Sequence, residues 1–134
     1  SGTDRVWEVA KSLPEYALVF NVQGDEPFLD PATLAQTIDA MRAQPGIDIM
    51  TTVTPIRSAA EWENPNMVKA VLSSDGRALY FSRAAIPYDR DGGDHRTGYR
   101  HLGLYLYRRA ALERSCSRRA ASLTSRMTQT PPAS

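Results

Sequence analysis

The chain has 134 residues, the length of one domain, and can bury roughly two-thirds of the surface it exposes when unfolded. Its 16 Lys and Arg residues balance 15 Asp and Glu residues, so it lacks the positive excess that binds nucleic acid by counterion release. A single cysteine, Cys116, excludes an intrachain disulfide and a cysteine-based zinc site. No apolar run approaches the roughly 20 residues that span a bilayer. We therefore expect a cytoplasmic protein with no nucleic-acid partner and no membrane insertion.

A helix and a buried strand are the first elements expected along the chain. Thr3 or Asp4 can cap a helix that ends near Pro14, because its apolar residues recur at helical spacing. Residues 17–22 form a short apolar run without alternation, which is typical of a central strand covered on both faces. The polar loop at residues 23–27 should lie at the carboxyl end of that strand.

A second helix and a second strand follow. Asp30 before Pro31 predicts a capped helix start, and this helix should stop before Pro45. Residues 47–53 then form the next strand. A strand, a helix and a strand in this order imply a right-handed parallel crossover, so the predicted fold class is α/β.

The middle of the chain predicts a short helix and a β-hairpin. Ser58, with Glu61 three residues later, makes a capping box. Residues 68–72 and 77–81 flank a Ser-Ser-Asp-Gly turn, which is typical of a hairpin. The loop at residues 82–98 is rich in Gly, Asp and Arg, a composition typical of a mobile segment.

A strand with two distinct faces is expected at residues 99–107. Its leucines alternate with other residues and should face a core. The opposite face carries His101, Gly103 and Tyr105. We expect the glycine to leave room for a small ligand to approach the backbone there.

The chain changes character near its end. Residues 115–134 contain no acidic and no aromatic residue, and their only large apolar side chains are Leu123 and Met127. They also interrupt a helix that residues 108–114 begin. Either a disordered tail or an out-of-frame translation would explain this composition. We therefore divide the chain into a domain at residues 1–114 and an atypical tail.

The loop at residues 23–27 is the first candidate for a functional site, because open α/β sheets bind ligands at loops that leave the carboxyl ends of strands. Asp25 and Glu26 could hold a divalent cation, since Mg²⁺ prefers one or two carboxylates with waters and substrate phosphates. The alternative is an ordinary acidic turn closed by Pro27. Gln23 weighs against that alternative, because a simple turn does not require an amide there.

The first four residues are a second candidate. They lie at the start of a predicted helix, whose N-terminal N–H groups favour anionic and hydrogen-bonding ligands. Plain helix capping is the alternative. The residues concerned are Ser1, Gly2, Thr3 and Asp4.

Two further pairs of residues could contact a ligand. His101 and Tyr105 share one face of a strand, where a structural histidine is the alternative. Ser82 and Arg83 follow the hairpin and could place a guanidinium on a carboxylate or a phosphate, with a solvated loop arginine as the alternative. The sequence contains neither a Ser-His-Asp set nor a Walker loop, so we expect neither a hydrolase nor a P-loop protein.

Five motifs, taken together, resemble those of one enzyme family. In chain order they are SGTDRV, NVQGDEP, NPNMVKAV, GRALYFSRAAIPY and YRHLGLYLYR. Over residues 1–113 they resemble the 3-deoxy-manno-octulosonate (Kdo) cytidylyltransferases, or CMP-Kdo synthetases. The resemblance implies a homodimeric enzyme with a Rossmann-like nucleotide-diphospho-sugar transferase fold. It also implies a reaction of CTP with Kdo that gives CMP-Kdo and pyrophosphate for lipopolysaccharide synthesis.

The same resemblance assigns roles to individual residues. Asp25 corresponds to a catalytic magnesium ligand. The residues that it assigns to the sugar-acid substrate are Gln23, His101, Tyr105, Arg5, Ser82 and Arg83. Those that it assigns to the nucleotide are Ser1, Gly2, Thr3 and Asp4.

The implied mechanism is an in-line attack by the anomeric hydroxyl of Kdo on the α-phosphorus of CTP, with Mg²⁺ neutralising the phosphates. The family has a strand and a phosphate-binding loop before the first motif, and a second metal-binding aspartate after the last. Neither is in this sequence, so we expect a partial domain that is inactive alone and in which Asp25 is the lone protein ligand of the metal. Another sugar nucleotidyltransferase of this fold and a non-catalytic sugar-acid-binding module are the alternative functions.

Overall fold

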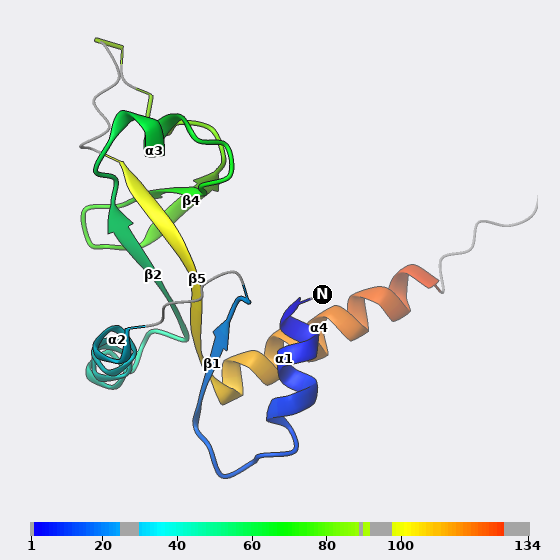
Figure 1. Ribbon diagram of the computed structural model, residues 1–134. Helices are drawn as coiled ribbons and strands as arrows, with labels where there is room; N and C mark the ends of the chain where they lie inside the picture. The colour runs from blue at the N-terminus through cyan, green and yellow to red at the C-terminus, as the bar shows by residue number, and fades with distance from the viewer. Residues whose placement is uncertain (1, 25–29, 89, 92–97, 128–134) are drawn as a thin grey trace, which may run out of the picture. The chain divides into compact units, whose positions relative to one another are not determined.

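The computed structural model describes residues 2–24, 30–88, 90–91 and 98–127, with side chains described as far as residue 118. Its helices and strands are drawn in Figure 1. In chain order they are α1 (Gly2–Ala10), β1 (Leu18–Val22), α2 (Pro31–Ala43), β2 (Ile49–Pro55), α3 (Ala59–Glu63), β3 (Lys69–Leu72), β4 (Ala78–Ser82), β5 (Tyr99–Arg108) and α4 (Arg109–Met127). In the described part of the chain, no helix is both long and apolar enough to cross a bilayer.

The strands form one sheet, with the hydrogen-bonded order β1-β5-β3-β4 and with β2 also paired to β5. Strand β3 runs antiparallel to both β4 and β5. Helices and strands mixed in this way confirm the predicted α/β class. Both β1 and β2 pair with β5, and the parallel sense expected for the crossover between them stays a prediction.

Strand β1 differs from its expected environment. Its residues are only half-buried, and Val22 is 42% exposed. Among the described strands β1 pairs with β5 alone, so it lies at the end of the hydrogen-bonded order. The prediction of a central strand covered on both faces is therefore wrong for this structure, because an apolar run reports hydrophobicity and not the number of neighbouring strands.

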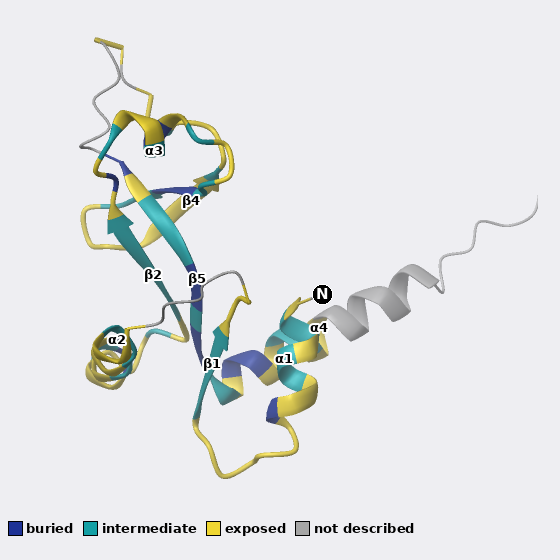
Figure 2. Ribbon diagram, viewed as in Figure 1, coloured by how far each residue is buried: buried dark blue, intermediate teal, exposed yellow. Residues whose placement is uncertain are grey.

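The chain forms two compact units, which are described separately. The first unit comprises residues 1–21, 30–50 and 105–134, and the second comprises residues 22–29 and 51–104. Figure 2 shows how buried, half-buried and exposed residues are distributed along the elements.

The core of the first unit lies where α1 packs against α4. Ala10, Tyr107 and Leu112 are buried there, and half-buried apolar residues pack around them.

Two consecutive arginines, Arg108 and Arg109, join this core to the ends of other elements. Arg108 donates from Nε to the Ile47 carbonyl at 2.7 Å and from Nη2 to the Met41 carbonyl at 2.6 Å. It thereby satisfies carbonyls at and just after the C-terminus of α2, where a positive charge is also favoured.

Arg109 likewise donates to backbone carbonyls, here in the segment between α1 and β1. Its guanidinium donates to the Tyr16 carbonyl at 2.5 Å and to the Leu13 carbonyl. It also lies 6.0 Å from the ring centroid of Trp7, within the range of a cation–π contact.

Local signals placed two helix starts correctly, at α2 and α3, whereas the cap expected at Thr3 or Asp4 is wrong, because α1 begins at Gly2 and includes both residues. The Asp30 side chain accepts from the Ala32 N–H at 3.0 Å at the start of α2. The Ser58 hydroxyl accepts from the Glu61 N–H at 3.2 Å at the start of α3, while the Glu61 carboxylate accepts from the Arg57 N–H at 3.0 Å. These two predicted caps are confirmed.

Helix α4 departs from the prediction. It continues without interruption from Arg109 to Met127, so the expected break after residue 114 is wrong. Residues 115–127 include three Arg, two Ala, one Leu and one Met, which have high helix propensity whatever they can bury. The division of the chain into a domain and a tail stays a prediction, and residues 128–134 lie outside the described residues.

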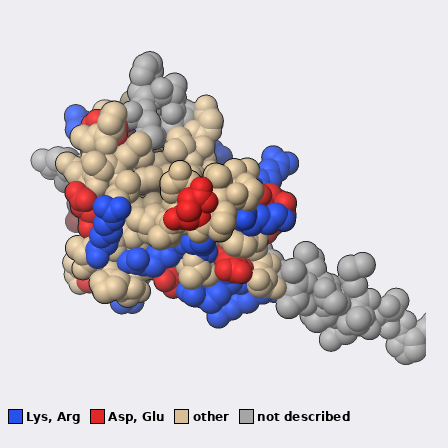
Figure 3. All heavy atoms as spheres, turned by 90° about the horizontal axis from the view of Figure 1, so that it is seen from below, with Lys and Arg blue, Asp and Glu red and all other residues tan. Residues whose placement is uncertain are grey.

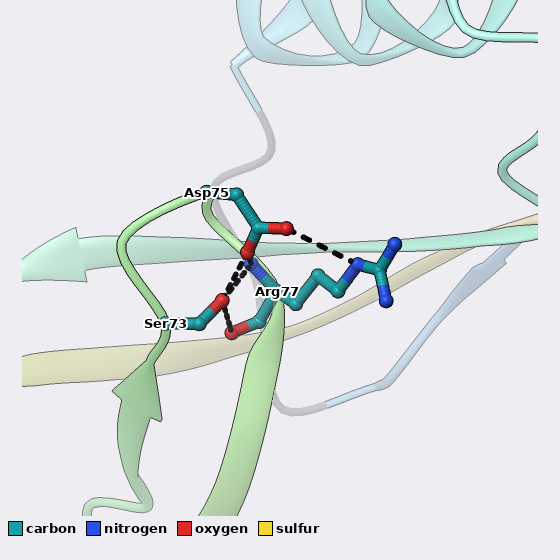
Figure 4. Close-up of polar contacts among 3 residues, drawn as sticks. All are labelled: Ser73, Asp75 and Arg77. Carbon is teal, nitrogen blue, oxygen red and sulfur yellow. Dashed lines mark hydrogen bonds and ion pairs between the residues drawn. The ribbon is translucent and has the colours of Figure 1, made fainter.

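The hairpin of the second unit confirms its prediction. Strands β3 and β4 pair antiparallel, and the turn between them has Gly76 at φ +86°, a conformation that favours glycine. Figure 4 shows the polar contacts of this turn. The Ser73 hydroxyl donates to the Asp75 carboxylate, which also accepts from the Arg77 N–H and lies 3.4 Å from the Arg77 guanidinium. These contacts hold the pKa of Asp75 below its ordinary value of 3.8.

Loss of the Ser73 hydroxyl should raise the pKa of Asp75. Because the folded-state pKa is depressed, Asp75 stabilises the hairpin above its unfolded pKa and loses that contribution as the pH falls through its folded pKa. We expect Ser73→Ala to shift the Asp75 carboxyl titration toward 3.8, measured by carboxyl ¹³C NMR. Ser12→Ala, which removes an exposed hydroxyl bonded to Val9, is the control. An unchanged Asp75 titration in Ser73→Ala would contradict the assigned cause.

Candidate functional site

Gln23 and Gly103 meet in the second unit. Gln23 directly follows β1, and its N–H donates to the Gly103 carbonyl at 3.1 Å. A Cβ atom on Gly103 would lie 2.8 Å from Cδ and 3.1 Å from Cγ of Gln23. The Gln23 side chain therefore covers the backbone of Gly103. The expectation of open room at this glycine is wrong, because the amide side chain itself takes up the space.

His101 lies near Gly103 on β5, held by groups from two other strands. The Thr51 hydroxyl, on β2, lies 2.6 Å from Nε2 of His101 and donates to the Leu104 carbonyl at 2.9 Å. The Phe81 ring, on β4, has its centroid 4.7 Å from that of the imidazole and is tilted by 51°. Sequence reasoning missed Thr51 and Phe81. Both lie in predicted strands, but only the pairing of those strands shows which side chains meet.

Ser82 and Arg83 are engaged by nearby backbone groups. The Ser82 hydroxyl accepts from the Ala84 N–H at 3.1 Å. The Arg83 guanidinium donates to the Pro65 carbonyl at 3.2 Å. The Arg83 contact joins the end of β4 to the turn before β3, and the Ser82 contact is local to the segment after β4. Their predicted contact with substrate stays a prediction.

Lys69 is a fully buried cation beside this pair. Its ammonium group donates to the Asn64 carbonyl at 2.6 Å and to the Arg83 carbonyl at 2.9 Å. Burial lowers the pKa of Lys69. Two carbonyl oxygens compensate part of the loss of hydration, which is what a buried charge requires. Lys69 and Arg83 thus cross-link the same two loops.

The first unit carries the other described site residues. Tyr105 is half-buried and stacks on Tyr107, with ring centroids 6.2 Å apart, and burial raises the pKa of its phenol. Arg5 is exposed on α1. Because Tyr105 belongs to the first unit and His101 to the second, their common ligand pocket stays a prediction.

The nucleotide and metal candidates are described only in part. Gly2 is exposed, and Thr3 and Asp4 are half-buried, all in the first turn of α1. Ser1 and Asp25 lie outside the described residues. Among the residues whose structure is described, no group of three or more His, Cys, Asp or Glu side chains could hold a metal ion. Magnesium binding therefore stays a prediction.

A shallow groove of about 440 Å³ lies in the first unit. It is open and mostly apolar, and its lining residues are Pro14, Glu15, Tyr16, Ala17, Arg108, Arg109, Ala110 and Glu113. Both arginines already donate to backbone carbonyls. None of the predicted site residues that the structure describes lines this groove. On the face drawn in Figure 3, basic and acidic side chains lie next to one another.

Comparison with known proteins gives consistent matches. A family profile described as Cytidylyltransferase matches residues 1–126. The chain is 53% identical over 115 residues to a 3-deoxy-manno-octulosonate cytidylyltransferase of Acidobacterium capsulatum, covering 85% of this chain and 45% of that protein. It is 47% identical over 134 residues to the protein of the same name from Paramagnetospirillum magneticum, covering 94% and 52%. The chain spans about half the length of the curated relatives it matches.

A solved structure gives the same match. It is CMP:2-keto-3-deoxy-manno-octonic acid synthetase complexed with CTP, with a TM-score of 0.77 and 39% sequence identity. The match covers 87% of this chain and 47% of that one. This likeness confirms the predicted fold, of which the chain forms a part.

The contact between Gln23 and Gly103 generates a test. We expect Gly103→Ala to displace the Gln23 side chain with little change in the free energy of unfolding, because the nearest atoms are the far end of a flexible, exposed side chain. Side-chain amide signals in a ¹H–¹⁵N spectrum report the displacement, and urea unfolding reports the stability. Gly24→Ala is the control, because a Cβ there meets no atom within 4 Å. Equal effects of the two substitutions would show that Gln23 does not pack on Gly103.

Proposed function

The chain belongs to the cytidylyltransferase family, and from this premise we propose that it is part of an enzyme that transfers CMP from CTP to Kdo with release of pyrophosphate. The observation that carries the proposal is its 53% identity to a 3-deoxy-manno-octulosonate cytidylyltransferase over 115 residues. The product would serve lipopolysaccharide synthesis in the cytoplasm.

Two polar side chains of the second unit support a sugar-acid site. The Gln23 side chain covers the backbone of Gly103 on β5, and the His101 imidazole, on the same strand, lies 2.6 Å from the Thr51 hydroxyl on β2. An amide offers a donor and an acceptor, and a neutral imidazole offers one of each, which suits a ligand with several hydroxyls and a carboxylate. In the proposal Tyr105, Arg5, Ser82 and Arg83 contact the same substrate.

The nucleotide would lie near residues 1–4, with the α-phosphorus of CTP in line with the anomeric hydroxyl of Kdo. Enzymes of phosphoryl transfer act mostly by positioning reactants and by stabilising charge. The Asp25 carboxylate has the donor chemistry that Mg²⁺ prefers, and the ion would supply positive charge to the triphosphate. The residues of this chain would bind and orient the sugar acid.

A homodimer is the proposed assembly, and the surface of β4 supports it. Strand β4 pairs only with β3 among the described strands. Leu79 and Tyr80 on this strand are each more than 60% exposed. Exposed apolar side chains on a strand at a sheet edge favour contact with another protein surface.

A chimera tests the proposed activity. The aligned 115 residues of this chain would replace those of the Acidobacterium capsulatum relative. We expect pyrophosphate release from CTP only when Kdo and Mg²⁺ are both present. Asp25→Asn should then reduce turnover about 100-fold, because it removes a metal ligand with little change of shape.

Asp39→Asn is the control for that substitution, since Asp39 is an exposed carboxylate on α2. The 134-residue chain by itself should release no measurable pyrophosphate. Release from the chimera without Kdo would contradict the substrate. Equal turnover of the Asp25→Asn and Asp39→Asn chimeras at limiting Mg²⁺ would contradict the metal role.

A further inference from the structure

We propose that Thr51 is a positioning residue that fixes the protonated nitrogen and the orientation of the His101 imidazole. Thr51 lies on β2, 50 residues before His101 in the sequence, and the two meet because β2 pairs with β5. What His101 does for a substrate rests on the proposed function. The hydrogen bonds from which we infer the role of Thr51 do not depend on the proposed function.

The chemistry of one hydroxyl group determines the direction of these bonds. The Thr51 hydroxyl has a single proton, and it lies 2.9 Å from the Leu104 carbonyl oxygen and 2.6 Å from Nε2 of His101. A carbonyl oxygen can only accept, so the hydroxyl proton goes to Leu104. The hydroxyl oxygen must then accept from the imidazole. Nε2 of His101 therefore carries a proton.

This assignment fixes the character of the other ring nitrogen. In the neutral imidazole only one nitrogen is protonated, so a proton on Nε2 leaves the lone pair on Nδ1. A nitrogen with a lone pair is a hydrogen-bond acceptor. The opposite tautomer would present an N–H group at Nδ1 instead. Thr51 thus determines whether the ring offers an acceptor or a donor at that atom.

The ring is also restrained in orientation. Phe81 lies against the imidazole with a centroid distance of 4.7 Å. Thr51 is β-branched, so its side chain has few rotamers, and its hydroxyl is held in addition by the Leu104 carbonyl. A rigid donor–acceptor chain through Leu104, Thr51 and His101 leaves the ring little freedom to flip. If the Thr51 hydroxyl only hydrogen-bonded β2 to β5, it would not control the tautomer of His101.

The first measurement is the tautomer of His101 in the 134-residue chain. The sequence has two histidines, so His95→Gln leaves His101 as the sole imidazole. Long-range ¹H–¹⁵N correlation spectra at a pH where the ring is neutral distinguish a proton on Nε2 from one on Nδ1. We expect Nε2–H in this background. A proton found mainly on Nδ1 would overturn the proposal without any substitution at Thr51.

Substitutions at Thr51 and at the next residue extend the test. Thr51→Val keeps the shape but removes the hydroxyl, and should give a mixture of tautomers, whereas Thr51→Ser should retain Nε2–H. Thr52→Val is the matched control, because the Thr52 hydroxyl is buried without a hydrogen-bond partner among the described residues. A folded Thr51→Val chain with an unchanged tautomer would overturn the proposal.

Binding of Kdo separates the inference from the proposed function. By calorimetry we expect Thr51→Val to weaken Kdo binding about tenfold, the effect of one hydrogen bond, with Thr51→Ser and Thr52→Val close to the parent chain. Equal affinities of Thr51→Val and the parent would overturn the positioning role. Failure of the parent chain to bind Kdo would count against the proposed function, and the tautomer spectra alone would then decide the role of Thr51.

Discussion

The hydrogen-bonding demand of strand β5 is the constraint on which the rest of the structure depends. A buried strand must pair its backbone N–H and carbonyl groups on both sides, and β5 does so with β1, β2 and β3. The His101 N–H donates to the Val68 carbonyl, and the Gly103 carbonyl accepts from Gln23. The polar side chains of the candidate site are therefore positioned by the same pairing that builds the sheet.

Four basic side chains of this chain donate to backbone carbonyls. Lys69 and Arg83 cross-link two loops of the second unit, and Arg108 and Arg109 do the same in the first unit. Strands and helices leave carbonyl groups at their ends without hydrogen-bond donors, which costs free energy. Each cation donates to such carbonyls and so removes that cost. Exposed ion pairs, such as Arg114 with Asp48 at 3.1 Å, add little by comparison. An arginine beside a predicted site is consequently weak support for a substrate contact.

The contacts that the sequence could predict are those between residues that lie close together along the chain. The caps at Asp30 and Ser58 and the turn before Arg77 involve residues within four positions of one another, and all three were predicted. The contact of Thr51 with His101 spans 50 positions and depends on strand register, which no local pattern encodes. Composition misled in α4, because residues that bury little can still have high helix propensity.

Gln23 was likewise predictable from sequence in one respect and not in another. Its place after a strand and within a resemblance motif marked it as a site residue, but its packing over Gly103 required the pairing of β1 with β5.

The central claim is that the second unit carries a sugar-acid site formed by Gln23 and His101. Titration of the ¹⁵N-labelled 134-residue chain with Kdo, and separately with glucuronate as a matched anion, tests it most directly. The account predicts that Kdo shifts the Gln23 side-chain amide and the His101 ring signals in a saturable manner, while glucuronate does not. Saturable binding of Kdo that leaves both residues unshifted would contradict it.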